Sequence, residues 1–253
     1  MATDSTKRFS NRVGNYIKYR PGYPAEVLAF LKKEYKLTPS SAIADIGSGT
    51  GIFTKLLLNE GYQVYAVEPN DAMRSAAENE LLGYKGFKSI NGTAGATGLP
   101  AKNIDLIVCA QAFHWFNNAQ TRHEFERILK DTGNVALIWN NRITNSDAFS
   151  VAYDELLQKD GLDYDKVNHQ NINDIDFKAF FSNGEYHITK YPNVQVFDEA
   201  GLIGRAFSSS YVPAEDTDAG KRFLLLLKQL FEKYNEAGMV KIHYQTEIYS
   251  GKV

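Results

Sequence analysis

The fold of this chain follows from one stretch of its sequence, Ala42-Ile43-Ala44-Asp45-Ile46-Gly47-Ser48-Gly49-Thr50-Gly51-Ile52. The first five residues form a short apolar run with one carboxylate, which is typical of a strand buried in a parallel sheet. Glycine then occupies every second position, and apolar residues at helical spacing follow from Ile52. Glycine lets the backbone approach a ligand closely, and ligands of parallel sheets bind beyond the carboxyl ends of the strands. This turn is therefore predicted to hold a ligand.

The same alternation of strand and helix continues through the first 140 residues. Further short apolar runs lie at Tyr65–Val67, Ile104–Cys109 and Val135–Trp139, and segments with helical periodicity separate them. Strands that alternate with helices of this length predict an α/β fold, with a mostly parallel sheet covered by helices on both faces. At the C-terminus, Val240–Ile248 alternates apolar and polar residues, which predicts a half-exposed antiparallel strand near a sheet edge.

We expect a single domain across residues 1–253, with three parts. Residues 23–140 form the ligand-binding core, residues 1–22 form an N-terminal arm, and residues 145–211 form a cap inserted after the core. The alternating pattern weakens in the cap, where one helix is predicted near Ala148–Gln158. A long helix is predicted at Glu215–Ala237, because apolar residues recur there at helical spacing.

The composition argues against several classes of protein. The net charge is −2, so no basic excess indicates a nucleic-acid partner. The one cysteine, Cys109, excludes a disulfide framework and a thiol-rich zinc site, and the histidines lack metal-binding spacing, so no metal is expected. The polar N-terminus contains no secretory signal and no apolar run is long enough to span a bilayer. We therefore expect a soluble cytoplasmic protein without a membrane partner.

The spacing of the glycines separates two classes of nucleotide site. The dinucleotide fingerprint needs a third glycine at the position that Ile52 occupies, which counts against a nicotinamide-dependent oxidoreductase. Glu68 follows the second strand, 17 residues after Gly51. A carboxylate at this place accepts hydrogen bonds from both hydroxyls of a ribose. Together these features predict an adenosine-containing ligand without a pyrophosphate.

On these residues the sequence resembles the class I S-adenosylmethionine (SAM) dependent methyltransferases. Their first motif corresponds to Ala44–Gly51, and Val67–Pro69 matches the segment after their second strand. The segments Tyr19–Pro24, Ala110–Phe116 and Gly204–Pro213 are similar to a small-molecule branch that includes trans-aconitate methyltransferase. The resemblance implies a Rossmann-like seven-stranded sheet whose last strand is antiparallel, with SAM as the cofactor.

The resemblance also implies which residues hold the cofactor. The glycines of the turn would line its methionine and ribose portion, Asp45 would orient its amino group, and Glu68 would bind its ribose hydroxyls. Many family members carry an acidic residue close to Thr93, and this sequence has none there, so weaker anchoring of the adenine is expected. The residues expected to bind the cofactor are Tyr16, Tyr19, Arg20, Asp45, Gly47, Gly49, Gly51, Glu68, Pro69, Met73, Thr93, Ala94 and Gln111.

Methyl transfer from a sulfonium depends mainly on placement of the acceptor and exclusion of water. A carboxylate acceptor needs no base. For a hydroxyl acceptor, His114 is the candidate general base, because imidazole titrates near neutrality. Arg20 would bind a carboxylate of SAM or of the substrate, and Tyr16 and Tyr19 are candidate neighbours of the sulfonium.

The acceptor pocket is expected between the arm, the segment after the fourth strand, and the cap. Trp115, Arg142 and Tyr211 are its candidate residues, chosen by their position. We therefore predict a SAM-dependent methyltransferase that acts on a small molecule with a carboxylate or hydroxyl acceptor, as a monomer or homodimer. The alternatives are a non-catalytic SAM-binding regulatory protein and a nicotinamide-dependent oxidoreductase.

Overall fold

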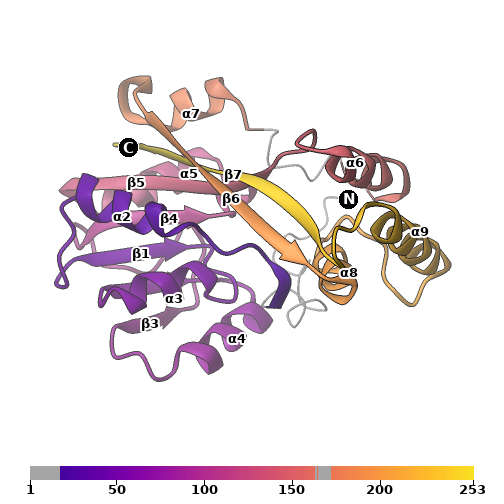
Figure 1. Cartoon of the computed structure of the whole chain (residues 1–253). Coiled ribbons are helices and arrows are strands. Elements are labelled where there is room, and N and C mark those ends of the chain that lie inside the picture. Colours follow the sequence, from indigo (N-terminus) through magenta and orange to yellow (C-terminus); the bar gives the residue numbers. More distant parts are fainter. Residues whose placement is uncertain (1–17, 163, 165–171) are drawn as a thin grey trace.

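A computed structural model describes residues 18–162, 164 and 172–253 of the chain. Its centre is a seven-stranded sheet in the order β3-β2-β1-β4-β5-β7-β6 (Figure 1). Six strands are parallel, and β7 runs antiparallel to its neighbours β5 and β6, which confirms the predicted fold class. The strands are β1 (Ala42–Ile46), β2 (Gln63–Val67), β3 (Phe87–Ile90), β4 (Ile104–Ala110), β5 (Leu129–Arg142), β6 (His187–Phe197) and β7 (Val240–Gly251).

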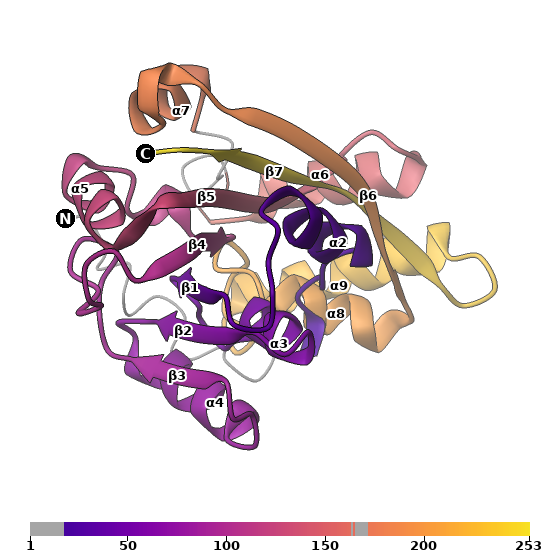
Figure 2. The ribbon, with the colours of Figure 1, turned by 90° about the vertical axis from the view of Figure 1, so that its left-hand side faces the viewer.

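Helices cover both faces of the sheet, as the alternating pattern predicts (Figure 2). On one face, α2 (Ala25–Glu34), α3 (Ile52–Asn59) and α4 (Asp71–Leu81) share an apolar core with side chains of β1, β2 and β4. On the other face, α5 (Ala119–Ile128) and α7 (Asp174–Phe180) form a second core with the opposite side chains of the same strands and of β5. The helices therefore shield both faces of these strands from water, which explains why the strand sequences are continuous apolar runs.

A third group of helices lies at the edge of the sheet where the parallel strands end (Figure 1). It consists of α6 (Ala148–Asp160), α8 (Glu199–Phe207) and α9 (Asp218–Tyr234), and it packs around the first residues of β7. Side-chain caps fix where these helices begin: the Oδ1 of Asp147 accepts a hydrogen bond from the Ser150 amide at 2.7 Å, and the Oγ1 of Thr217 accepts one from the Gly220 amide at 3.0 Å. The helix predicted at Glu215–Ala237 therefore begins after its Thr217 cap.

The segment predicted as a cap also supplies a strand of the sheet. Strand β6 lies within residues 145–211 and pairs with β7 along its whole length, from His187 to Phe197. Its burial alternates between exposed and half-buried residues, and Pro192 lies within it. Such a polar edge strand lacks the apolar run that identifies a buried strand, and proline is tolerated in a strand only at an edge or a bulge. For this reason the sequence analysis did not predict β6.

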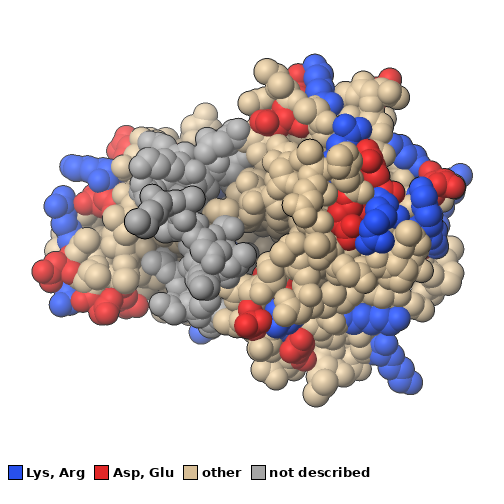
Figure 3. Space-filling view, turned by 180° about the vertical axis from the view of Figure 1, so that it is seen from behind, with Lys and Arg blue, Asp and Glu red and all other residues tan. Residues whose placement is uncertain are grey.

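The surface of the described residues matches the near-neutral composition. On the face seen in Figure 3, acidic and basic side chains lie interspersed beside a broad uncharged area. Within residues 18–162, 164 and 172–253, no helix is both long and apolar enough to cross a membrane.

Candidate functional site

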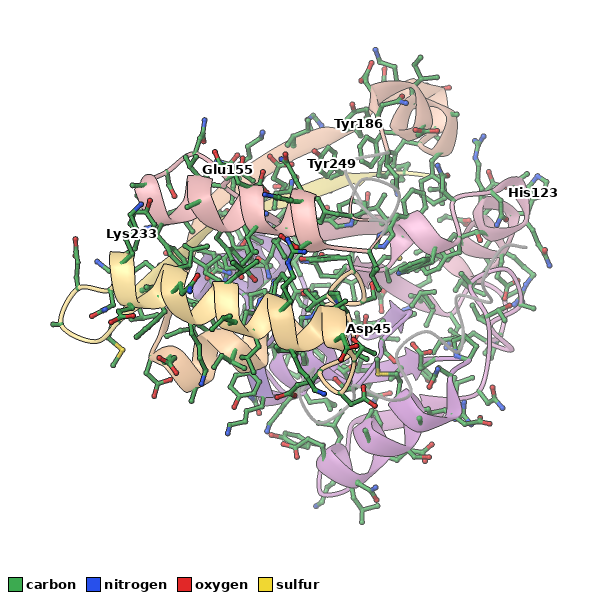
Figure 4. The ribbon with its side chains drawn as sticks, turned by 90° about the vertical axis from the view of Figure 1, so that its right-hand side faces the viewer. Asp45, His123, Glu155, Tyr186, Lys233 and Tyr249 are labelled. Atoms are coloured by element: carbon green, nitrogen blue, oxygen red, sulfur yellow. The ribbon has the colours of Figure 1, made fainter. Side chains whose placement is uncertain are left out.

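A cavity of about 650 Å³ opens at the carboxyl ends of the parallel strands. It lies between the glycine turn after β1, the segments that follow β2 and β4, and the helices α6 and α8. Figure 4 views the molecule from the side of these helices, and Asp45 comes into view at this edge of the sheet. Most of the residues singled out from the sequence line this one cavity: Arg20, Asp45, Gly47, Gly49, Glu68, Pro69, Met73, Thr93, Ala94, Gln111, His114, Trp115, Arg142 and Tyr211.

At two positions of the glycine turn, a side chain would face both an unfavourable positive φ and a close neighbour. Gly47 has a φ of 72°, and a Cβ on it would lie 2.7 Å from the Cβ of Ala112. Gly51 has a φ of 81°, and a Cβ on it would lie 2.7 Å from Leu81 Cδ1. Gly51 therefore allows α3 to pack on α4; it is not among the residues that line the cavity, and its role in cofactor binding stays a prediction.

Glu68 is held by backbone amides at the wall of the cavity. Its Oε2 accepts a hydrogen bond from the Gly49 amide at 2.9 Å, and its Oε1 accepts one from the Asn70 amide at 2.8 Å. Burial raises the pKa of this carboxyl, and these two hydrogen bonds oppose the rise. A carboxylate has about four lone-pair sites, so two amide bonds leave capacity for further donors from a ligand.

Asp45 is fully buried beside the glycine turn. Its Oδ2 accepts a hydrogen bond from Thr54 Oγ1 at 2.6 Å, whereas its Oδ1 has no partner among the described residues. The hydroxyls of Ser48 and Thr50, which line the same cavity, are also buried without a partner in this part of the chain. Burial raises the pKa of Asp45 to about 7. Since buried polar groups are nearly always satisfied, this cluster fits a polar ligand.

The structure describes two of the three arm residues expected at the site, and one of these two lines the cavity. Arg20 lines it and donates from Nη2 to the carbonyl oxygen of Ser208 at 3.1 Å. The ring of Tyr19 packs instead on Gly204 of α8, where an added Cβ would lie 2.1 Å from Tyr19 Cε2, so Tyr19 is not among the lining residues. Tyr16 lies outside the described residues.

His114 lies in a short 3-10 helix, η2 (Phe113–Trp115), directly after β4. Its Nδ1 accepts a hydrogen bond from Trp139 Nε1 at 3.5 Å. An indole nitrogen is only a donor, so Nδ1 is the unprotonated nitrogen and Nε2 carries the proton of the neutral ring. Gln111, also after β4, has a φ of 59°, and its backbone N–H donates to the carbonyl oxygen of Ile138 at 2.8 Å.

The side of the cavity next to α6 and α8 contains the predicted residue Arg142 together with Asp154, Arg205 and Tyr244, which were not predicted as site residues. Arg142 forms an ion pair with Asp154 of α6 and donates to the Tyr164 hydroxyl at 2.6 Å. Arg205 of α8 is 5% exposed and donates from Nε to the Tyr244 hydroxyl at 3.1 Å. Arg205 belongs to a segment that the sequence analysis singled out, but nothing local in the sequence connects it to Tyr244, 39 residues further on.

Comparison with known proteins identifies one domain and several relatives. Residues 44–137 match the family described as a methyltransferase domain. The chain is 32% identical over 140 residues to an uncharacterized methyltransferase-like protein of Schizosaccharomyces pombe, and 31% identical over 157 residues to a second uncharacterized methyltransferase of that yeast. These alignments cover 54% and 60% of this chain and 52% and 60% of the two relatives. The chain thus spans between half and two thirds of the relatives' own length.

Solved structures extend the likeness across the whole fold. A putative type II methyltransferase from Anaeromyxobacter dehalogenans is 18% identical with a TM-score of 0.66, and the match covers 92% of this chain and 98% of that one. Phosphoethanolamine N-methyltransferase 2 from Haemonchus contortus, solved with phosphomonomethylethanolamine and S-adenosylhomocysteine, is 15% identical with a TM-score of 0.56. That match covers 98% of this chain and 58% of the other. At such identities the two structures support the fold.

Proposed function

Since the chain carries a methyltransferase domain of the class I SAM-dependent family at residues 44–137, we propose that it transfers the methyl group of SAM to a small-molecule acceptor. The observation that carries the proposal is the set of buried polar atoms around the glycine turn. Asp45 Oδ1, Ser48 Oγ and Thr50 Oγ1 line one cavity without partners among the described residues, beside the fixed carboxylate of Glu68.

These residues fit the chemical groups of SAM one by one. Asp45 faces the cavity with an unused carboxylate oxygen, which suits a cationic amino group. Glu68 keeps lone pairs for the two ribose hydroxyls, and Arg20 offers a guanidinium to the carboxylate of the cofactor. Pro69, Met73, Thr93 and Ala94 complete the wall on the side expected for the adenine. SAM, when bound, supplies a methyl group on a positively charged sulfur.

The acceptor would occupy the rest of the cavity. A volume of about 650 Å³ lies within the range of pockets for small ligands, roughly 300–1,000 Å³. Trp115, Arg142 and Tyr211 line this part, and α6 and α8 add Asp154, Gln158 and Arg205 to its wall. Methyl transfer is favoured where such walls orient the acceptor and limit its contact with water. A carboxylate or hydroxyl acceptor and the closer likeness to trans-aconitate methyltransferase stay predictions, as do a cytoplasmic location and the oligomeric state.

The test is methyl transfer from SAM labelled on its methyl group to a panel of small carboxylic acids and hydroxyl compounds. We expect labelled product with the wild-type protein, and none with Glu68→Ala, which removes the ribose contact. Glu80→Ala is the matched control, because Glu80 lies on α4 outside the cavity in an exposed ion pair with Lys55. SAM binding without transfer to any acceptor would instead favour the non-catalytic regulatory alternative.

A further inference from the structure

Arg205 of α8 is a buried cation in the wall of the cavity. It is 5% exposed, and its guanidinium donates to two hydroxyl groups, from Nε to Tyr244 at 3.1 Å and from Nη1 to Ser209 at 2.9 Å. Within the part of the chain that the structure describes, it forms no ion pair with a carboxylate. An arginine stays protonated in a protein, and a buried charge is costly unless an opposite charge compensates it. This position therefore calls for an anion.

The Tyr244 hydroxyl does not supply this negative charge. It donates to Gln195 Oε1 at 3.0 Å, and Gln195 Nε2 donates in turn to the carbonyl oxygen of Tyr19 at 3.2 Å. Because the amide nitrogen of Gln195 is engaged by this carbonyl, its amide oxygen faces Tyr244, and an amide oxygen can only accept. Tyr244 therefore keeps its proton and meets Arg205 as a neutral phenol.

The carboxylate that α6 contributes to the cavity, Asp154, belongs to another cation. It forms an ion pair with Arg142, and its Oδ1 also accepts a hydrogen bond from the Tyr164 hydroxyl at 2.8 Å. Its Oδ2 accepts a hydrogen bond from Gln158 Nε2 at 2.7 Å. The charge of Arg142 is thus compensated within the protein, whereas the charge of Arg205 in the same cavity has no such partner among the described residues.

The cofactor increases the need for an anion on this side. In the binding mode described above, Arg20 takes the carboxylate of SAM, while Asp45 and Glu68 take its ammonium group and its ribose. The ammonium and the carboxylate of SAM cancel, so its sulfonium adds a net positive charge to the cavity. The sulfonium and Arg205 would then both border the space of the acceptor, and charges interact strongly where little water is present. A negatively charged acceptor is attracted by both.

We propose that Arg205 binds an anionic group of the methyl acceptor, a carboxylate or a phosphate, and thereby selects anionic small molecules. This inference rests on the proposed function and names the class of its substrate. A guanidinium is a planar fork of N–H donors that matches both anionic groups. Nε and Nη1 each hold a hydroxyl, and Nη2 donates to no described residue, so Nη2 remains for the anion. Arg205 takes no part in the covalent step.

A purely structural role for Arg205 leads to different expectations. Its hydrogen bond to Tyr244 joins α8 to β7, so its removal would lower stability in either case. A residue that only joins these two elements would leave the preference among ligands unchanged. The preference of the cavity for charged over neutral ligands is therefore the measurement that distinguishes the two roles.

The first test compares probes that differ in charge on the wild-type protein. Calorimetric titration of the full chain, alone and saturated with S-adenosylhomocysteine, pairs phenylacetate with phenylacetamide and phenyl phosphate with phenol. We expect at least one anion to bind about tenfold more tightly than its neutral counterpart, because hydrogen bonds to charged groups are the stronger ones. The pair with the larger preference identifies the group as a carboxylate or a phosphate. Equal binding within both pairs, or binding of neither anion, would overturn the proposal.

The second test assigns the preference to Arg205. Arg205→Met, which removes the cation, should abolish it, and Arg205→Lys, which keeps a cation without the fork, should retain part of it. Arg222→Met is the matched control, because Arg222 lies on α9 outside the cavity in an ion pair with Asp160, and it should keep the full preference. An unchanged preference in Arg205→Met would overturn the proposal.

The affinity for S-adenosylhomocysteine separates the acceptor from the cofactor. Its dissociation constant should stay within about twofold in all three variants, because groups without shared contacts act independently. Loss of this affinity in Arg205→Met would assign the anion to the cofactor's own carboxylate and overturn the proposal. Should Arg205→Met not fold, Arg205→Lys and the wild-type comparison still decide. Failure of the wild-type protein to bind SAM and S-adenosylhomocysteine would overturn the proposed function, while the titration of the free protein would still test Arg205.

Discussion

The two halves of the cavity are lined by residues of different chemistry. The donor half, next to β1, β2 and β3, uses backbone glycines and two buried carboxylates, Asp45 and Glu68. The acceptor half, next to β5, β7, α6 and α8, uses the guanidinium groups of Arg142 and Arg205 and several tyrosines. The donor half is thus suited to a cationic cofactor, whereas the acceptor half is lined by two guanidinium groups and the carboxylate of Asp154.

The halves also differ in how the chain assembles them. In the donor half, the hydrogen bond from Gly49 to Glu68 joins residues that are 19 positions apart, across one strand–helix–strand unit. In the acceptor half, Arg205 of α8 donates to the hydroxyl of Tyr244 on β7, 39 positions further along the chain. One half is a local unit of the sheet, and the other depends on packing between distant segments. Substitutions should therefore affect the two halves independently, and we order four such tests by their expected effect on SAM affinity.

Gly47→Ala should have the largest effect, with loss of measurable SAM binding. The left-handed backbone costs a non-glycine residue about 1–2 kcal/mol, and the new Cβ would meet Ala112 at 2.7 Å and displace the turn. The control is Gly61→Ala, which has a φ of 85° but nothing within 4 Å of the added Cβ. Calorimetric titration should show normal SAM binding for the control. Normal binding by Gly47→Ala would show that the turn does not need to approach the cofactor.

Glu68→Gln should weaken SAM binding by about 10- to 100-fold. Hydrogen bonds to a charged group are worth about 1.5–3 kcal/mol each, and the amide also replaces one acceptor oxygen by a donor. Glu80→Gln provides the comparison, since Glu80 is exposed on α4 and outside the cavity. If the dissociation constants of the two variants agree, Glu68 does not bind the ribose.

SAM affinity should rise about tenfold between pH 6 and pH 8, because Asp45 has a pKa of about 7 and its ionised form binds the ammonium group. Asp45→Asn should abolish this dependence. For the free protein the sign is opposite: between the unfolded pKa near 3.8 and the folded value, the native state holds a proton that the unfolded state has lost. The Asp45 contribution to stability therefore decreases as pH rises through this window, and Asp45→Asn should remove that decrease in thermal unfolding.

Asp154→Asn should leave the dissociation constant of SAM within about twofold while it lowers methyl transfer. The substitution leaves Arg142 without its carboxylate partner in the acceptor half, far from Glu68 along the sheet order. Measured together, the SAM dissociation constant and the transfer rate distinguish an effect on the donor half from an effect on the acceptor half. A large loss of SAM affinity would show that they are energetically coupled.

The donor half and the fold were predictable from sequence because their signals are local. The apolar run that ends at Asp45, the alternate glycines and Glu68 lie within two consecutive strands, and short-range spacing places them at one sheet edge. The close approach of Gly51 to Leu81 could not be predicted, because it follows only from the placement of α4. The spacing of residues along the sequence does not predict such a contact between two helices.

The acceptor half could be predicted only in part. Arg142 and Tyr211 were chosen by position, and their contacts with Asp154 and Tyr164 follow from how α6 and the segment after it pack beside β5. Arg205 meets Tyr244 only because α8 packs on the first residues of β7. The edge strand β6 was missed for a related reason, since a polar strand at an edge has no apolar run. The Arg205–Tyr244 contact and the pairing of β6 with β7 both depend on packing between segments that are far apart in the sequence, which local sequence patterns do not predict.

We infer that the glycine turn and its two carboxylates hold SAM. Calorimetric titration of the full chain with SAM, S-adenosylhomocysteine and NADH in parallel tests it most directly. We expect that both SAM-type ligands bind with micromolar dissociation constants and that NADH does not bind. Binding of NADH without binding of SAM would contradict it, and would assign the turn to a dinucleotide.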